Sequence, residues 1–590
     1  MKTTTGAKLP APADSGVAET FRRTSQAAER EDGPAGRLYT RMTRREFLGQ
    51  SAAMAALPVL EGSLGGREYP GGDAPSRREQ ATPSFQTDFA PLQAKYDAAV
   101  EGLKKNRRPV FLRPSDVLIE GATYAGIWLE SGPQEGLLYA PFDPAIAVSN
   151  HRVFFDLQRA DGYLPCCVRF DRMESSQIQT VVPIAATALE LAENLQDEGL
   201  LRLAYCAGSA WDDWLMRYRN TRGTGLCEAF CGFDTGEDKS ARFKGLPWKC
   251  PNDDARVCPK VGKLPYLAPD LSATVYGGRL ALAAMARHLG KRNEAEQWQE
   301  KAESIRRAIF KWCFDPEDAC FYDRDRDNHF VRVRCVELLV TLGEHVPDRK
   351  LFEEIYGRHV RNPREFWTPF PFPSVAADDP AFDHSMPNDS WGGPSQVLTA
   401  LRAPRWVEYY GKCADLTHVM RQWVKATLAS PHFEQQVNPW TGQFSTGHAY
   451  SPGMLLLTDF VSRLYGARQA GGEIEWNCRL PEGATESQFQ MPTRQGMAEL
   501  ATRAAGAGAG RARGGDAAPP SETSSELILA GKKLLTLRGR ARVVTDARGA
   551  VVRLVGTEPS QRKVSLEWPS GRLREFSLRA DETIRLNSTA

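Results

Sequence analysis

Residues 235–243, with the sequence TGEDKSARF, collect side chains that could do acid–base chemistry. A solvated turn uses Gly, Asp, Lys and Ser freely, but it has less use for Arg242 and Phe243 directly behind them. Glu237 and Asp238 form a carboxylate pair, and Asp234 lies just upstream. Burial and like-charge repulsion can raise the pKa of such a carboxyl until it stays protonated near neutral pH. The segment is therefore a candidate reactive loop, provided that the rest of the chain builds a cleft around it.

Three further loop regions have a similar composition. They cover residues 124–136 (YAGIWLESGPQEG), residues 158–165 (QRADGYLP) followed by Gln177 and Gln179, and the split pair 388–396 (NDSWGGPSQ) and 433–442 (FEQQVNPWTG). These regions combine carboxylates or amides with aromatic rings. Because flat rings can cover the apolar C–H faces of sugars, such loops suit a carbohydrate ligand.

The elements that must position these loops are predicted to be helices. Apolar residues at helical spacing indicate helices over 178–195 and 200–217, and a third over 271–289 with Asp270 as its cap and Gly290 as its stop. Further helical runs lie near 348–360, 395–411, 413–428 and 452–466. Short joints alternate with the long loops, so residues 84–467 are predicted to form neighbouring helix pairs. A closed toroid and an open solenoid both fit, and the absence of a repeat at a fixed period weighs against the solenoid.

The character of the chain changes after residue 470. Residues 503–523 (RAAGAGAGRARGGDAAPPSET) are of low complexity and are predicted to be a flexible insert. Residues 470–498 and 524–590 flank this insert, and from 524 onward apolar and polar residues alternate between glycine turns. That pattern predicts a small antiparallel β domain.

The amino-terminal part holds a candidate export signal. Residues 1–41 are polar and are predicted to be a disordered leader or a mis-assigned start, since Met42 could begin the chain. Residues 42–65 then resemble a twin-arginine signal, with Arg44-Arg45 before Phe47-Leu48 and an Ala-rich stretch. This stretch is too short and too polar for a stable membrane span. The prediction is export by the twin-arginine translocase to the periplasm or the outside.

Composition excludes some classes of function. The 75 basic and 73 acidic residues nearly balance, which argues against a nucleic-acid partner. The 12 cysteines include Cys227, Cys231, Cys250 and Cys258, whose spacings are too loose for a zinc motif. We expect structural cysteines, free or paired, and nothing in the sequence demands a metal or a cofactor.

Taken in order, the loop motifs resemble those of inverting (α/α)6-barrel glycosidases, a group that includes trehalases, processing α-glucosidases and mannosylglycerate hydrolases. GEDKSARF is similar to their Gly-Trp-Asp-x-Ser-x-Arg pattern, and FEQQVNPWTG is similar to their Glu…Asn-Pro-x-Thr-Gly segment. DSWGGP resembles their Trp-Arg-Gly-Pro segment, and DGYLP resembles their early Asp-Gly-x-Leu-Pro. The resemblance covers about residues 120–467. It implies a mainly α fold, an (α/α)6 toroid carrying the C-terminal antiparallel β domain, and hydrolysis of α-linked glycosides.

The resemblance also implies roles for two carboxylates. Asp238 takes the place of the general acid and Glu434 the place of the general base. An inverting hydrolase needs one carboxylic acid to protonate the leaving oxygen and a second carboxylate, roughly 6.5–9.5 Å away, to activate water on the opposite face. Each residue has a plainer interpretation: Asp238 as a turn residue, and Glu434 as a cap of the turn before NPWTG.

The sequence departs from the family pattern at several positions, and the Glu that often precedes the Gly of the pattern is missing. Glu237 stands where the pattern has Trp, and Gly392 stands where it has Arg. Glu434 precedes Asn438 by four residues instead of three, so Gln435 could occupy the position of the base. Glutamine cannot take a proton from water, so the base would then come from elsewhere or the protein would be inactive.

Eight residues complete the predicted site as substrate contacts: Trp128, Asp161, Gln179, Asp234, Glu237, Arg242, Trp391 and Trp440. The three tryptophans are candidate stacking platforms, although Trp391 fits a packed core equally well. Arg242 would oppose the raised pKa of Asp238 if the two were paired, so a substrate hydroxyl or a structural role is assigned to it instead. Gln179 could equally satisfy backbone groups inside the barrel.

Two other classes of function stay open. A carbohydrate-binding protein could keep the cleft but lack the base, as the departures at 237 and 435 suggest. A polysaccharide lyase or epimerase on a related toroid would use Tyr, His or Arg to remove a proton. Only nine His occur in the chain, so the Asp/Glu loops favour hydrolysis.

Overall fold

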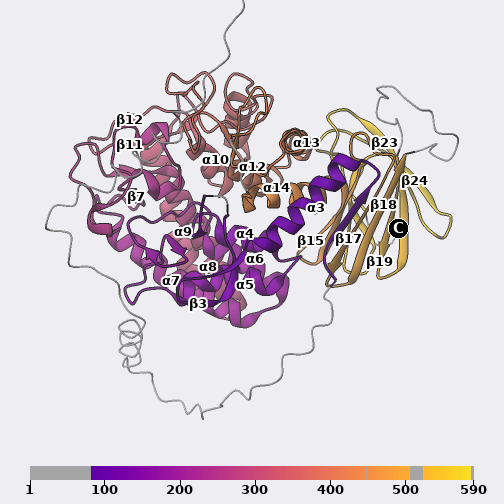
Figure 1. Ribbon diagram of the computed structural model, residues 1–590, viewed down its shortest axis with the longest axis horizontal. Coiled ribbons are helices and arrows are strands. Elements are labelled where there is room, and N and C mark those ends of the chain that lie inside the picture. The colour runs from indigo at the N-terminus through magenta and orange to yellow at the C-terminus, as the bar shows by residue number, and fades with distance from the viewer. Residues whose placement is uncertain (1–80, 122, 446–448, 505–522, 587–590) are drawn as a thin grey trace, which may run out of the picture. The chain divides into compact units, whose positions relative to one another are not determined.

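The structure is a computed structural model that describes residues 81–121, 123–445, 449–504 and 523–586. All of these residues belong to one compact unit, Asp73–Ala590. The predicted leader (1–41) and twin-arginine segment (42–65) lie outside the described residues, as does nearly all of the insert at 503–523. Figure 1 shows helices up to residue 465 and packed strands beyond it.

Twelve α-helices occur in the described part of the chain. They are α3 (Ala90–Lys105), α4 (Gly132–Tyr139), α5 (Pro144–Asp156), α6 (Ile184–Leu195), α7 (Glu198–Tyr218), α8 (Pro269–His288), α9 (Arg292–Cys313), α10 (Val336–Gly343), α11 (Arg349–Ile355), α12 (Val397–Val407), α13 (Cys413–Ala429) and α14 (Ser451–Tyr465). Neighbours in the sequence pack as pairs: α4 with α5, α6 with α7, α8 with α9, and α12 with α13. The first of these helices, α3, packs against the last, α14.

Every second helix from α4 onward belongs to a set that we call the ring helices: α4, α6, α8, α10, α12 and α14. Each packs against the next one in this order, and α14 packs in turn against α4. The series therefore returns to its first member (Figure 1). The helices α3 and α9 each pack on one ring helix, whereas α5, α7 and α13 each pack on two consecutive ring helices.

Local sequence determines where the ring helices begin. The predicted start at Ile178 is wrong: α6 begins at Ile184, directly after Pro183. Proline disfavours the helical conformation in the residue before it, so the apolar residues at 178–182 stay outside the helix. The prediction of Asp270 as the cap of α8 is also wrong. The helix begins at Pro269, in the first turn where proline is favoured, so Asp270 lies inside the helix.

The loops that precede the ring helices are joined by short β pairings. Before α12 and α14, respectively, β13 (Ser395–Gln396) and β14 (Gln436–Val437) pair with each other. Before α8 and α10, respectively, β8 (Tyr266–Leu267) and β11 (Asp323–Arg324) pair in the same way. These pairings bring the long loops together beside the first turns of the ring helices.

Buried acidic side chains occupy those first turns. Glu135 in α4, Asp270 in α8 and Glu337 in α10 are all buried. The amino-terminal end of a helix carries a partial positive charge, which stabilises nearby carboxylates. The partial positive charge at the start of these ring helices therefore favours carboxylates at this end.

The last part of the chain forms two antiparallel sheets. One has the order β1-β17-β18-β19-β20-β23-β24 and the other the order β15-β16-β21-β22-β25. Their bounds are β1 (Ser84–Thr87), β15 (Ala467–Ala470), β16 (Glu473–Cys478), β17 (Glu486–Thr493), β18 (Gly496–Ala504), β19 (Thr523–Leu529), β20 (Lys532–Arg538), β21 (Ala541–Thr545), β22 (Val551–Val555), β23 (Arg562–Glu567), β24 (Leu573–Leu578) and β25 (Thr583–Arg585). In β19 buried and half-buried residues alternate, as the sequence pattern predicts.

The expected domain boundary at residue 84 differs from the structure. Ser84–Thr87 forms β1, which pairs with β17 in the seven-stranded sheet. The physical reason is Phe85, which is buried against Tyr96 of α3 and Tyr465 of α14. The strand therefore joins the sheet and the helices at the start of the described chain.

Glu408, directly after α12, connects the helices to the five-stranded sheet. Its carboxylate accepts from Arg542 of β21 at 2.7 Å, from Arg463 of α14 at 2.8 Å and from Arg468 of β15 at 3.4 Å. We call these four residues the Glu408 cluster. The arginines hold the pKa of Glu408 well below its usual range, against the effect of burial.

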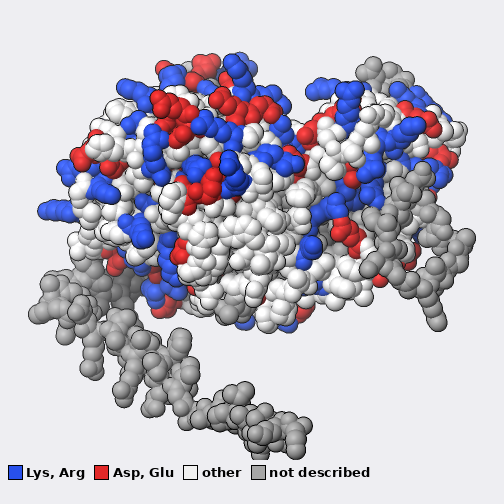
Figure 2. Space-filling view, turned by 90° about the horizontal axis from the view of Figure 1, so that it is seen from above, with Lys and Arg blue, Asp and Glu red and all other residues white. Residues whose placement is uncertain are grey.

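Charged residues on the surface are mixed. Figure 2 shows Lys and Arg interspersed with Asp and Glu over the face it presents, in keeping with the balanced composition. Among the described residues, no helix is long and apolar enough to cross a membrane.

Candidate active site

The segment 235–243, here called the Asp238 loop, is packed tightly against the loop before α4. Gly236 has a φ of +70°, which L-residues rarely adopt, and a Cβ at this position would lie 1.3 Å from Oε2 of Glu130. Any larger residue would push the Glu130 carboxyl away. This glycine therefore sets the distance between the Asp238 loop and Glu130.

Arg242 anchors the Asp238 loop at the centre of a buried group of carboxylates. Its guanidinium donates to Glu237 at 2.9 and 3.2 Å, to both oxygens of Asp323 at 3.2 Å, and to Asp270. Glu337 adds a further negative charge. We call these five residues the Arg242 cluster. Since Arg242 is only 3% exposed, the structure favours the structural one of its two predicted roles.

The Arg242 cluster contains more carboxyls than cations. Burial raises the pKa of Asp323 to about 7 and raises the pKa of Glu237 and of Glu337, while Arg242 opposes the rise in each case. One cation cannot offset four buried carboxylates, so protons are held within the cluster near neutral pH. Glu237, a predicted substrate contact, is 2% exposed and bonded to Arg242 and Ser240.

Asp238 itself lies at the edge of this buried region and is partly exposed. Burial and, after it, the charge of Asp389 raise its pKa to about 6, whereas Lys239 and the hydroxyl of Tyr124 oppose the rise. At pH 6 about half of the Asp238 side chains would carry a proton. The group can therefore both hold a proton near neutral pH and release it to a bound molecule.

A second segment runs beside Asp238. Lys239 Nζ donates to the carbonyl of Asn388 at 2.9 Å, and the backbone N–H of Trp391 donates to the carbonyl of Asp238 at 2.7 Å. Asp389 lies between these two contacts and is exposed. Lys239 and Asp389 both have positive φ, +57° and +51°, a conformation found at turns and functional sites. The two contacts place a solvent-exposed carboxylate next to Asp238.

The segment before β14 places Gln435, and not Glu434, against this group. The hydroxyl of Tyr124 donates to Oε1 of Gln435 at 2.8 Å, and the same hydroxyl interacts with the carboxyl of Asp238. The carboxylate of Glu434 accepts from Ser430 at 3.0 Å and acts electrostatically on Lys95 of α3. These contacts give Gln435 the position beside Asp238 that the family pattern gives to the base.

Several buried polar atoms of the helical part of the chain lack hydrogen-bond partners among the described residues. They include Oε2 of Glu130, Nε of Arg402, Oγ1 of Thr399, and Oε1 of Gln134, Gln179 and Gln396. Arg402 donates to the carbonyl of Glu130 at 3.0 Å, which ties α12 to this loop. Buried polar atoms are normally satisfied by protein, water or ligand. Such atoms indicate a place where hydroxyl groups can bind.

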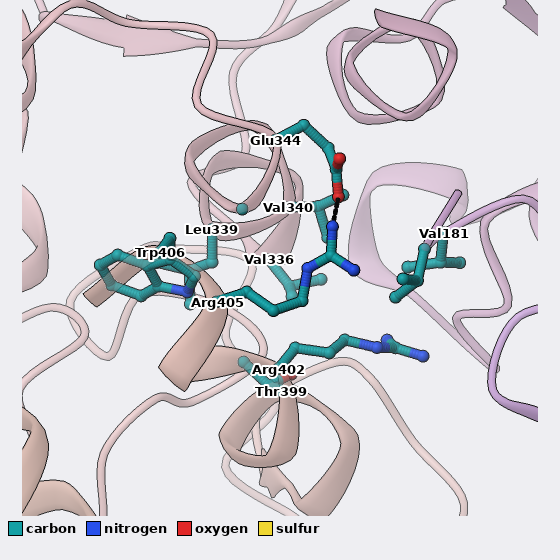
Figure 3. A pocket seen from close by; sticks show the side chains of 11 residues that line it. Val181, Val336, Leu339, Val340, Glu344, Thr399, Arg402, Arg405 and Trp406 are labelled. Carbon is teal, nitrogen blue, oxygen red and sulfur yellow. Dashed lines mark hydrogen bonds and ion pairs between the residues drawn. The ribbon is translucent and has the colours of Figure 1, made fainter. Parts of the chain in front are cut away.

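Arg402 also lines a cavity between α10, α12 and the residues before α6. Figure 3 shows its side chain reaching across from α12 toward Val181, next to Arg405, which pairs with Glu344 at 3.0 Å. The cavity is small, with about 20 Å³ open to the centre of a water molecule, which is room for about one water. Its apolar walls include Val340 and Leu339, and its polar lining consists of Glu344, Thr399, Arg402 and Arg405.

Three carboxyls that interact with Arg402 have raised pKa values. Burial raises the pKa of Glu130 to about 8 and that of Glu135 to about 7, with Arg402 opposing both. Burial and the charges of those two residues raise the pKa of Glu120 well above its usual range, although Tyr450 donates to it at 2.9 Å. Protonated carboxyls can donate hydrogen bonds but cannot remove a proton from water.

The other predicted substrate contacts fall into two groups. Trp128 lies edge-on to Tyr124 with ring centroids 5.6 Å apart, and Trp391 is bonded to Asp238 through its backbone, so both lie at the site. Gln179 is buried with a φ of +41°. Trp440 is 40% exposed and packs against Phe382 at 5.4 Å, which leaves its ring accessible.

Asp161 and Asp234 lie in ion pairs of their own. Asp161 pairs with Arg159 and accepts from Trp214, whereas Asp234 is fully buried and paired with Arg219. Asp234 also accepts from the backbone N–H groups of Ile178, Phe230 and Cys231. Such saturated carboxylates hold loops in place, so a structural role fits them better than contact with a substrate.

The structure adds site residues that sequence reasoning missed. Tyr124 and Asp389 fall inside segments singled out for their composition, but neither was predicted to act. Arg402 lies on α12, outside the candidate loops, and Glu130 was noted only as a loop carboxylate. An arginine on the buried face of a predicted helix is the one signal that could have pointed to Arg402.

Comparisons with known proteins concern the family and the fold of this chain. Residues 136–451, more than half of the chain, match the Mannosylglycerate hydrolase MGH1-like glycoside hydrolase domain. None of the curated proteins matches the sequence. Among solved structures, an uncharacterized conserved protein from Thermus thermophilus is 20% identical, with a TM-score of 0.52, covering 62% of this chain and 100% of that one.

Two further solved structures share the fold. The GH63 mannosylglycerate hydrolase from Thermus thermophilus in complex with glucose is 18% identical, with a TM-score of 0.52, covering 62% of this chain and 99% of its own. A sialidase is 14% identical, with a TM-score of 0.58, covering 78% of this chain and 41% of its own. At these identities the likeness concerns the fold, and the domain match over residues 136–451 carries the assignment. The chain belongs to the MGH1-like glycoside hydrolase family.

Proposed function

We propose that this glycosidase is an inverting hydrolase whose general acid is Asp238. The observation that carries the proposal is the state of Asp238: a partly exposed carboxyl with its pKa raised to about 6, beside Tyr124. As the glycosidic bond breaks, the Asp238 carboxyl gives its proton to the leaving oxygen. Water then attacks the anomeric carbon from the opposite face.

We also propose that the ring helices and their partners form an (α/α)6 toroid. The support is the series of contacts that runs from α4 to α14 and back to α4, with one partner helix packed outside most members. A closed ring brings loops far apart in the sequence to one end. This explains how residues near 124, 238, 389 and 435 can share one site.

For the general base we propose Asp389. Gln435 beside Tyr124 cannot accept a proton, and burial raises the pKa of Glu130 to about 8, that of Glu135 to about 7 and that of Glu120 well above its usual range, which favours their protonated forms. Asp389 is exposed to water, and its charge acts on Asp238 and on Tyr124. Glu434, the base predicted from the sequence, remains the alternative that the experiment below separates.

The proposed substrate is a short α-linked glycoside. The solved structure of similar fold named above is a mannosylglycerate hydrolase bound to glucose, so α-mannosides and α-glucosides are the first compounds to screen. The unpartnered polar atoms of Gln134, Gln396 and Thr399 would bind hydroxyl groups of the sugar. Trp128 and Trp440 would stack on its faces.

The acid and the base respond differently to the leaving group. Asp238→Asn should lower kcat/KM by about 10²–10⁴-fold on an alkyl α-glycoside, but much less on an α-glycosyl fluoride, because fluoride leaves without a proton. Asp389→Asn should lower kcat/KM on both substrates, since both need activated water. Glu434→Gln should change either rate by only a few fold. Loss of both activities in Glu434→Gln with little effect of Asp389→Asn would assign the base to Glu434 instead.

A second candidate function is carbohydrate binding without hydrolysis. The observation that favours it is Gln435 in the position beside Asp238 where a base is expected. A wild-type chain that binds α-glycosides in calorimetry but releases no sugar would support this candidate. Gln435→Glu would then be expected to create hydrolysis, because it places a carboxylate next to Tyr124.

Export is proposed from the sequence alone. Arg44-Arg45 before Phe47-Leu48 supports passage of the folded chain through a twin-arginine translocase. Replacing both arginines with lysine should retain the protein in the cytoplasm of a producing bacterium. Equal periplasmic amounts of the wild-type chain and the double variant would contradict the proposal.

A further inference from the structure

Two buried cysteines lie on either side of the Asp238 loop. Cys231 and Cys250 pack with Phe230, and the partly buried Cys258 packs against them. The two sulfur atoms are 3.8 Å apart, and both cysteines are free thiols in this structure. A bond between these two cysteines would close a chain segment that contains Asp238.

The backbone around this pair is already joined. The N–H of Gly232, directly after Cys231, donates to the carbonyl of Pro247 at 3.0 Å, and the N–H of Phe233 donates to the carbonyl of Trp248 at 3.1 Å. A disulfide needs sulfur atoms ~2.0 Å apart, so rotations of the two side chains have to close the gap. The paired backbone holds both residues in reach of each other while they do so.

The two cysteines could instead bind a metal ion together with Asp234. Cys231, Asp234 and Cys250 present ligand atoms within 4.8 Å of one another. The two oxygens of Asp234, however, already accept from the Arg219 guanidinium and from three backbone N–H groups. Arg219 also contacts the sulfur of Cys250 at 3.7 Å. A cation already occupies the place that a metal ion would take, which favours a bond between the sulfurs.

We propose that Cys231 and Cys250 form a disulfide that closes the segment carrying Asp238. Each thiol gives up its hydrogen and the pair gives up two electrons. These pass to a low-molecular-weight disulfide such as oxidised glutathione, which is reduced to two thiols through a mixed disulfide on one of the cysteines. The bond closes the segment between residues 231 and 250 and limits the freedom of the Asp238 loop in the unfolded chain.

The test is peptide mapping of the full chain, which is independent of its activity. Protein produced in reduced form is incubated with oxidised glutathione in mild urea, so that the buried thiols become accessible. Remaining thiols are blocked with iodoacetamide after denaturation, and the digest is analysed by mass spectrometry. The expected result is a Cys231 peptide joined to a Cys250 peptide, with the loss of two hydrogens, absent from Cys231→Ser and kept in the control Cys206→Ser on the surface of α7.

A second measurement follows the consequence for stability. The oxidised wild-type chain should unfold a few degrees above the reduced chain, and Cys231→Ser should show no such difference. Full alkylation of Cys231 and Cys250 after oxidation would overturn the proposal. So would a Cys250–Cys258 bond, or stoichiometric zinc that is lost in Cys231→Ser.

Discussion

The two buried ion clusters of this protein differ in their balance of charge. The Arg242 cluster sets one guanidinium against Glu237, Asp270, Asp323 and Glu337 below the Asp238 loop. In the Glu408 cluster three arginines surround one carboxylate, where the helices meet the five-stranded sheet, and Asp459 and Glu475 pair with the same arginines. Of the two clusters, the Arg242 cluster therefore has a surplus of carboxyls, and the difference in their behaviour comes from that surplus.

The surplus matters because buried carboxyls can take up protons. In the Arg242 cluster the pKa of Asp323 is raised to about 7, so surplus negative charge is removed by protonation. In the Glu408 cluster the arginines balance the carboxylates, so the pKa of Glu408 is lowered and it stays ionised. The carboxyls of the Arg242 cluster thus hold protons near neutral pH. Asp238 also has to hold a proton there in order to act as an acid.

The pH dependence of stability should differ accordingly. A carboxyl whose pKa is raised on folding stabilises the fold below its ordinary pKa and loses that contribution as the pH rises through the raised value. For Asp323 the window runs from its ordinary 3.8 to about 7. Glu408, with a lowered pKa, contributes above its ordinary 4.5 and loses this contribution as the pH falls below it.

The largest expected effect is that of Arg242→Met. Removing the one cation leaves buried carboxylates unpaired, which should cost about 3–5 kcal/mol of the free energy of unfolding at pH 8. The loss should shrink toward pH 5, because the carboxyls then take up protons. Urea unfolding at both pH values measures this, and a loss that does not depend on pH would refute the comparison.

Glu408→Gln should have the next largest effect, and its pH dependence should appear only in a more acidic range. We expect a loss of about 1–3 kcal/mol, because Arg463 and Arg542 keep other partners in Asp459 and Glu475. The loss should be constant from pH 6 to pH 8 and decrease only below about pH 4.5, where wild-type Glu408 loses its own contribution. Urea unfolding over the same pH series tests it, and relief already at pH 6 would count against it.

Gly236→Ala tests the packing of the Asp238 loop. The added methyl group would overlap Glu130 Oε2, so we expect a loss of about 1–3 kcal/mol and a clear fall in activity. Gly245→Ala is the matched control, because Gly245 also has a positive φ, +81°, but no atom lies within 4 Å of the added Cβ. Equal unfolding midpoints and equal kcat/KM in the two variants would show that contact with Glu130 does not matter.

The smallest expected effect is that of Lys239→Met. Lys239 lowers the pKa of Asp238, so its removal should raise that pKa and move the fall of activity at high pH to a higher value. The exposed Lys244 provides the control, and Lys244→Met should leave the profile where it is. A shift of the Lys239→Met profile toward lower pH would show that Lys239 does not lower the pKa of Asp238.

The sequence reveals much of this fold because helical stripes are local signals. The pairing of neighbouring helices, the strands after residue 470 and the importance of Asp238 all follow from residues within one segment. The start of α6 could have been placed correctly by giving more weight to Pro183. Strand β1 could not, because its partner β17 lies about four hundred residues further along the chain.

The parts of the site that sequence reasoning missed depend on contacts between distant segments. Arg242 becomes structural only because Asp270 and Asp323 reach it from 28 and 81 residues away. Asp389 comes to Asp238 through the contact of Lys239 with Asn388, 149 residues further on. The spacing of Glu434 from Asn438 already indicated that Gln435 could occupy the position of the base. The hydrogen bond from Tyr124 to Gln435 agrees with that interpretation.

The central claim is that Asp238 acts as a proton donor, and the pH dependence of kcat/KM tests it most directly. Profiles for the full chain on an alkyl α-glycoside report the pKa values of the free enzyme. The prediction is that kcat/KM falls above about pH 6, as Asp238 loses its proton, and that Asp238→Asn removes both the activity and this fall. A profile that stays level from pH 6 to pH 8, or an Asp238→Asn variant with wild-type activity, would contradict it.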